Sequence, residues 1–265
     1  MTKKRVIRVV LWVGVALSLG TWAIGQTSVV LTAPTPGPSY DGIYVSPYYA
    51  TVGGVANTPI VCDDFGDDTS IGDKWNATVT AFSGLTAPAG TSWDLAGKGS
   101  LAAYDAVGWL TTQVLAQTSG SVGQIVYTFA DWAVFDPSGV ASYLTSNPVT
   151  SGPLTTATLC TDIFGSAGCT GTWVQADGGL LATAFGPTAT VPAGGYGFEI
   201  LSPDTPGTTT VCAAENIKNP CPAQEFIAVV PEGGAAFAYL LLASFCCFGA
   251  IRTRARRQIG STTAA

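Results

Sequence analysis

Residues 74–82, KWNATVTAF, alternate polar and apolar side chains from Lys74 to Ala81. An alternation with a period of two is typical of a β-strand that buries one face. Two further runs rich in aromatic and β-branched residues precede it, GIYVSPYYATV at 42–52 and PIVCDDF at 59–65. The folded domain is therefore predicted to begin with β-strands.

The hydrophobic period changes to three and four residues in the middle of the chain. In residues 100–117, SLAAYDAVGWLTTQVLAQ, apolar side chains around Tyr104 recur every three or four positions, so they would lie on one face of a helix. VGQIVYTFADWAVFDPSG, residues 122–139, does the same around Phe129 and reaches Pro137, which predicts a stop. Two amphipathic helices are expected here.

Short strands and turns are expected again after the two helices. The runs are GTWVQA (171–176), LLATAF (180–185), GYGFEILSPD (195–204) and EFIAVV (225–230). The fold class predicted for residues 40–230 is therefore α+β, a β-dominated exported ectodomain with a two-helix insert.

Both ends of the chain carry targeting features. Residues 1–25 combine an N-terminal basic stretch, an apolar run and small residues before Gln26, the layout of a signal peptide, with an uncleaved anchor as the alternative. Residues 26–39, which end in APTPGPS, are interpreted as a Pro-rich linker. The ectodomain is therefore expected outside the cytoplasm.

The charge of the central region limits its partners. Between residues 26 and 231, three lysines face sixteen acidic side chains, a net charge of −13. Such a domain repels phosphate backbones, so nucleic acid is not expected as a partner. Because the chain has no histidine, Ser-His-Asp and Cys-His nucleophile pairs and His-containing metal sites are excluded. We expect no enzyme activity.

The cysteine spacing predicts disulfides. CTDIFGSAGC and CAAENIKNPC suggest local bridges Cys160–Cys169 and Cys212–Cys221, although spacing alone leaves other pairings open. The simplest pairing leaves Cys62 without a partner.

An acidic run follows Cys62 and is a candidate cation site. Asp63, Asp64, Asp67 and Asp68 offer carboxylate oxygens of the kind that Ca²⁺ prefers. Their spacing lacks the EF-hand pattern, and a solvated turn is the alternative. No other cofactor is indicated.

A second apolar segment lies near the C-terminus. Residues 235–251 carry no formal charge and would form a helix of about 25 Å, at the short end of a membrane span. Arg252, Arg254, Arg256 and Arg257 follow directly and favour a cytoplasmic end. By physics alone this is a stop-transfer anchor.

The sequence VVPEGG before this segment adds a resemblance. A Pro-Glu motif, a short apolar helix and an Arg cluster resemble the sorting region of PEP-CTERM proteins of Gram-negative bacteria. The resemblance spans residues 231–257, with Pro231 and Glu232 as the motif, Gly233 where the family usually has Pro, and 258–265 as a tail. It implies recognition and cleavage by an exosortase-like membrane protease, followed by release to the cell surface or matrix.

The ectodomain is similar in its order of elements to some PEP-CTERM ectodomains and, more distantly, to thioester domains of bacterial adhesins. In those domains a Cys and a Gln side chain form a thioester. Cys62 matches the cysteine, but Asp131 stands at the glutamine position and Gln124 is the near substitute. A buried structural thiol is the alternative role for Cys62.

Together these features predict a non-catalytic cell-surface or biofilm-matrix protein. It would be anchored by the C-terminal helix or released after cleavage, and extracellular polysaccharide is a candidate partner. Two other functions remain open: a covalent thioester adhesin, and a secreted hydrolase that uses carboxylates.

Overall fold

The computed structural model describes residues 26–32, 39–40, 43–65, 69–81, 100–150, 154–169, 178–191, 197–203 and 224–229. The chain divides into two compact units, residues 1–229 and 230–265, and every described residue belongs to the first. The predicted signal peptide at 1–25, the predicted sorting region at 231–257 and the tail at 258–265 lie outside the described ranges. No helix within those ranges is long and apolar enough to cross a membrane.

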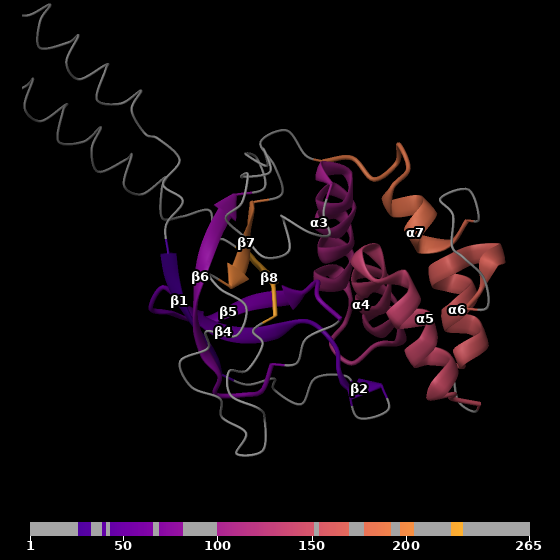
Figure 1. Cartoon of the computed structure of the whole chain (residues 1–265), viewed down its shortest axis with the longest axis horizontal. Helices are drawn as coiled ribbons and strands as arrows, with labels where there is room; N and C mark the ends of the chain where they lie inside the picture. Colours follow the sequence, from indigo (N-terminus) through magenta and orange to yellow (C-terminus); the bar gives the residue numbers. More distant parts are fainter. Residues whose placement is uncertain are drawn as a thin grey trace, which may run out of the picture. The chain divides into compact units, whose positions relative to one another are not determined.

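Six antiparallel strands close into a barrel in the order β1-β4-β5-β8-β7-β6 (Figure 1). Their bounds are β1 Gln26–Leu31, β4 Tyr48–Val52, β5 Val55–Cys62, β6 Lys74–Ala81, β7 Phe198–Pro203 and β8 Phe226–Val229. A separate pair, β2 (Ser39–Tyr40) and β3 (Ile43–Tyr44), lies outside the barrel sheet. Closure pairs every barrel strand on both sides, so none of the six is an exposed edge.

Two glycines make the tight turn between β4 and β5. Gly53 and Gly54 have φ angles of 56° and 85°, and they connect the paired residues Val52 and Val55. A two-residue hairpin turn with φ above zero at both positions favours glycine, because side chains are strained there. The turn connects β4 directly to β5, which ends at Cys62.

The predicted strand at 74–82 is present as β6. Trp75 and Ala77 are buried in the core, whereas Lys74 and Asn76 are exposed, as the alternation predicts. Thr78 and Thr80 on the opposite face are buried as well. The second half of β6 is therefore covered on both faces.

The linker prediction for residues 26–39 is wrong at its start. Gln26–Leu31 forms β1, which pairs with both β4 and β6. Val29 and Leu31 are 0% and 1% exposed, so this segment belongs to the core. The prolines that suggested a linker begin only after the strand has ended.

The described residues contain five α-helices, not two. Figure 1 shows them beside the barrel. The predicted pair is present as α3 (Leu101–Ala116) and α4 (Val122–Phe135). They are followed by α5 (Pro137–Ser146), α6 (Thr156–Phe164), a 3₁₀ turn η2 (Gly165–Ala167) and α7 (Gly179–Ala184). The described part is therefore a mixed α+β fold, and the prediction of a β-dominated domain with only two helices is wrong.

Side-chain caps explain where several of these helices begin. The hydroxyls of Ser100 and Ser121 accept the backbone N–H of the third residue of α3 and α4, both at 3.2 Å. The Asp136 carboxylate accepts the N–H of Gly139 at 2.8 Å, so Pro137 occupies the first turn of α5 and starts a helix there. The predicted stop at Pro137 is a junction between two helices.

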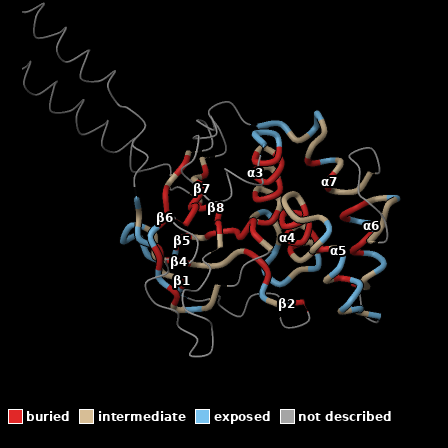
Figure 2. Tube along the Cα trace, viewed as in Figure 1, coloured by how far each residue is buried: buried red, intermediate tan, exposed pale blue. Residues whose placement is uncertain are grey.

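The core extends from the barrel interior to the helices, as the buried segments in Figure 2 show. Beside the barrel, Phe129 of α4 packs edge-on against Tyr40 of β2 and against Trp132 of the same helix, with ring centroids 5.3 Å and 5.0 Å apart. Phe65, just after β5, packs on Trp132 at 5.3 Å. This shared core holds α4 against the end of β5.

Candidate functional site

Acidic side chains from distant parts of the chain meet at one end of the barrel. Asp63 and Asp64 directly follow β5, and Glu225 directly precedes β8. The strands bring them together because Cys62 pairs with Phe226, which also pairs with Leu201 of β7. We call Asp63, Asp64 and Glu225 the carboxyl cluster; all three are at most 4% exposed.

Glu225 is the centre of the carboxyl cluster. Its Oε1 accepts a hydrogen bond from the Tyr104 hydroxyl of α3 at 2.7 Å, and its Oε2 accepts one from the Ser202 hydroxyl of β7. The Asp63 side chain lies beside the same carboxyl. Burial raises the pKa of Glu225, the nearby charge of Asp64 raises it further, and the interactions with Ser202, Tyr104 and Asp63 oppose the shift.

Cys62 lies beside the carboxyl cluster and is fully buried and unpaired. Its thiol donates to the Asp64 carbonyl oxygen at 3.0 Å, and its backbone N–H donates to Ser46 Oγ at 3.1 Å. Burial raises the pKa of the Cys62 thiol well above its ordinary value, and the charges of Asp64 and Asp63 add to this. A thiol in this setting stays protonated and is a poor nucleophile.

The thioester geometry is not assembled around Cys62. The indole of Trp132, in the second half of α4, lies beside the thiol. Gln124 is eight positions earlier on the helix, about 12 Å along its axis at 1.5 Å per residue. The Gln124 side chain instead accepts the Gly120 N–H at 2.9 Å. Its carboxamide therefore caps the start of α4 and does not reach Cys62.

Asp131, at the glutamine position of the adhesin pattern, is a second buried acid. It is 0% exposed, and neither carboxyl oxygen has a hydrogen-bond partner within the described ranges. Burial raises its pKa well above the ordinary value. A carboxyl group in such surroundings is held in its neutral form.

The predicted calcium site gains no support from the part of the chain that the structure describes. Asp67 and Asp68 lie outside that part. Within it, no three Asp, Glu or Cys side chains are grouped as metal ligands. Asp63 makes its contact to Glu225 instead.

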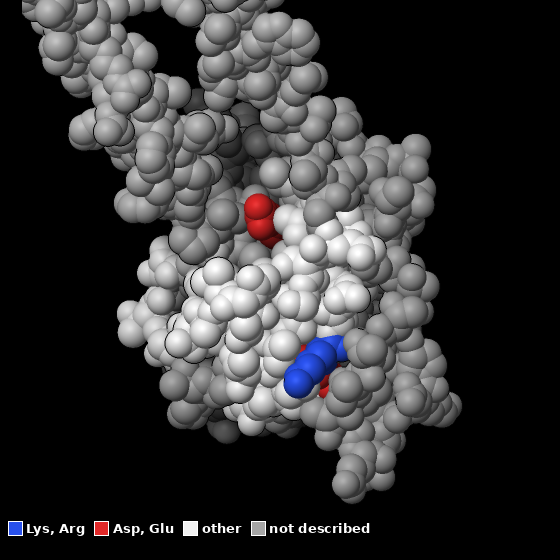
Figure 3. Space-filling model, turned by 90° about the vertical axis from the view of Figure 1, so that its left-hand side faces the viewer, with Lys and Arg blue, Asp and Glu red and all other residues white. Residues whose placement is uncertain are grey.

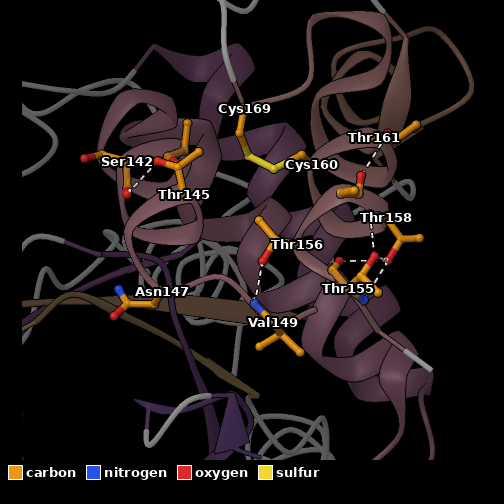
Figure 4. Close-up of a disulfide and its surroundings, with 12 residues drawn as sticks. Ser142, Thr145, Asn147, Val149, Thr155, Thr156, Thr158, Cys160, Thr161 and Cys169 are labelled. Carbon is orange, nitrogen blue, oxygen red and sulfur yellow. Dashed lines mark hydrogen bonds between the residues drawn. A yellow bond between two sulfur atoms is a disulfide. The ribbon is translucent and has the colours of Figure 1, made fainter. Parts of the chain in front are cut away.

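The predicted Cys160–Cys169 disulfide is present (Figure 4). It joins α6 to the turn after η2, with Cα atoms 5.1 Å apart. Cys212, Cys221 and the sorting residues Pro231, Glu232, Gly233, Arg252, Arg254, Arg256 and Arg257 lie outside the described ranges.

The described surface carries few charges, as the face in Figure 3 illustrates. Lys74, exposed on β6, is the one Lys or Arg side chain within the described ranges. Five of the nine Asp and Glu side chains there are buried, namely Asp63, Asp64, Asp73, Asp131 and Glu225. The buried acids therefore have no buried cation beside them among the described residues.

Sequence reasoning missed Glu225, Tyr104 and Ser202 as site residues. Tyr104 and Glu225 are 121 positions apart, and Ser202 and Glu225 are 23 apart, so no local motif joins them. The available signal was positional: Asp63 ends one apolar strand and Glu225 begins another.

No family model, no curated protein and no solved structure matches the chain. The interpretation of the site therefore depends on its geometry.

Proposed function

We propose that this chain is an exported, non-catalytic protein of the cell envelope or extracellular matrix. Its folded domain would be the mature part, and residues 231–257 would act as a sorting signal for an exosortase-like membrane protease. Extracellular polysaccharide is the partner proposed for the mature domain.

The observation that carries this proposal is the position of the last barrel strand. β8 ends at Val229, which is also the last residue of the first compact unit, and Pro231 follows two positions later. Cleavage next to Glu232 would therefore remove no strand of the barrel. Loss of the tail would leave all six barrel strands in the chain, as a disposable signal requires.

Two features of the domain support the proposed destination and class. The Cys160–Cys169 disulfide fits an oxidising compartment outside the cytoplasm. Cys62, which an adhesin would need, is 0% exposed, and Asp63 and Glu225 of the carboxyl cluster are each 1% exposed. A substrate reaching them would have to open the core first.

The test is the intact mass of the protein recovered from its native host, in the membrane fraction and in the released fraction. We expect a released form that ends near Glu232 and begins near Gln26. Glu232→Gln should leave the full tail on the protein, whereas Asp162→Asn, an acid-to-amide change on exposed α6, should be processed normally. Release of the Glu232→Gln protein at the same truncated mass would contradict the proposed motif.

The same spectra address the alternatives. Retention of the full tail by the wild-type protein would indicate a permanent anchor instead of a sorting signal. If the wild-type protein is lighter than expected by one ammonia and Cys62→Ala is not, a thioester is indicated. Co-sedimentation of the released form with the host's purified extracellular polysaccharide tests the proposed partner, and no enrichment over the supernatant would argue against it.

A further inference from the structure

The Asp63–Glu225 pair has to hold a proton. The two residues are cross-strand neighbours, because the adjacent Cys62 and Phe226 are paired and the Asp63 backbone N lies 3.5 Å from the Glu225 carbonyl oxygen. Both side chains are 1% exposed, and two ionised carboxylates buried side by side repel each other strongly. Aspartic proteases show the general behaviour, with two close carboxyl groups that share one proton.

The surroundings of the pair offer nothing that would stabilise a second negative charge. Asp64 and Cys62 face it from the end of β5, and the charge on Asp64 raises the pKa of Glu225. Tyr104 faces it from α3 and Ser202 from β7, both as neutral donors. No Lys or Arg among the described residues approaches it, because Lys74 is exposed on β6.

The pair lies where the barrel is closed. β8 is hydrogen-bonded to β5 on one side and to β7 on the other. Asp63 extends β5, Glu225 leads into β8, and the backbone N–H of Asp63 also lies 3.5 Å from the Glu225 carbonyl oxygen. Through Ser202 and Tyr104 the same carboxyl joins β7 and α3 to this point. Repulsion here would act directly on the pairing of β8.

We propose that the Asp63–Glu225 pair is a pH-sensitive closure of the barrel, in which one shared proton holds β8 between β5 and β7. When that proton passes to solvent, the two facing carboxylates repel and β8 separates more readily from its neighbours. The direction follows from burial, which raises the pKa of Glu225 above its ordinary value of 4.5. The contribution of the pair to stability is full below that value and is lost as the pH rises through the pKa of the folded state.

Amide hydrogen exchange on the full chain, purified in detergent, tests this locally. Exchange of the β8 amides, Phe226–Val229, is compared with that of β1, which lies across the barrel in the strand order, at pH 5, 7 and 9 after correction for the intrinsic rates. We expect β8 in the wild type to lose at least tenfold in protection relative to β1 over this range.

The matched variant is Glu225→Gln, which keeps the size of the side chain and supplies an amide donor to an ionised Asp63. This variant should lose most of the pH dependence of amide protection in β8, whereas the exposed control Asp162→Asn should show the same pH dependence as the wild type. Equal pH dependence in the wild type and in folded Glu225→Gln, or none in the wild type, would overturn the proposal.

A second measurement covers the case in which Glu225→Gln does not fold. Asp63→Asn removes the other carboxyl of the pair and should flatten the same profile. The infrared band of a protonated carboxyl is recorded from pH 5 to pH 9 in an Asp131→Asn background, so that this other buried acid is absent. The band should be lost over the same pH range in which β8 loses protection. No band at pH 5, or a band that does not change as β8 loses protection, would overturn the proposal.

Discussion

Replacing Asp131 with asparagine should stabilise the domain at neutral pH. Asp131 is fully buried in α4, and its two oxygens have no hydrogen-bond partner among the described residues. Asparagine has nearly the same shape but no charge to remove. The substitution therefore changes the electrostatics of the site with little change in packing.

The size of the effect follows from the cost of keeping the carboxyl neutral. A group with an ordinary pKa of 3.8 that stays protonated at pH 7 costs the folded state up to about 4 kcal/mol, because each pH unit corresponds to about 1.4 kcal/mol. The buried Asn amide offsets about 1–3 kcal/mol of this gain, because its own hydrogen bonds are unsatisfied. A net gain of about 2 kcal/mol would raise the Tm by roughly 4–8 °C for a domain of this size.

The pH dependence separates this explanation from a packing effect. Because burial raises the pKa of Asp131, the wild-type domain keeps its full stability below about pH 4 and loses it as the pH rises. Calorimetric melts of the wild type, Asp131→Asn and the exposed control Asp162→Asn between pH 3.5 and 8 should show Asp131→Asn less stable than the wild type near pH 3.5, where only the unsatisfied amide counts, and more stable at pH 7 and 8. A lower Tm for Asp131→Asn at pH 7, or a difference that does not change with pH, would show that the carboxyl has a partner and refute the reasoning.

Three further predictions concern backbone, disulfide and thiol. Gly179→Ala should destabilise the domain by about 2 kcal/mol or more, because φ is 73° and a Cβ would come within 2.6 Å of backbone atoms at the end of α6. Thermal melts should show a smaller loss of stability for the control Gly168→Ala, which has a φ of 55° but open space around it. Reduction of Cys160–Cys169, nine residues apart, should lower the unfolding free energy by about 2–3 kcal/mol in urea titrations, and an unchanged midpoint would contradict this. Cys62 should resist alkylation in the folded protein and react in denaturant, and rapid labelling under native conditions would argue against a buried thiol.

The sequence was most informative where one local pattern decided the structure. The hydrophobic stripe predicted the helix at 100–117, and α3 spans Leu101–Ala116. The alternation at 74–82 predicted β6. In both segments the hydrophobic period extends over enough residues to distinguish a helix from a strand, so little tertiary information is needed.

The sequence misled where a short segment takes its structure from its neighbours. LLATAF at 180–185 suggested a strand, but Gly179–Ala184 is helical and packs against α6, with Leu181 fully buried. Gln26–Leu31 looked like part of a linker because of the prolines beyond it, yet it completes the barrel. Segments of six residues carry too few positions to distinguish a helix from a strand by period alone.

The chain alone determined the acidity of the domain, the absence of histidine chemistry and the three-part C-terminal tail as a pattern. It suggested the Cys160–Cys169 pairing, which the structure confirms. Only the tertiary structure decided that Asp63, Glu225, Tyr104 and Ser202 share one buried point, and that Gln124 does not reach Cys62. The physical reason is that burial and proton sharing depend on which distant strands become neighbours. Barrel closure sets those neighbours, and no local stretch of the sequence records them.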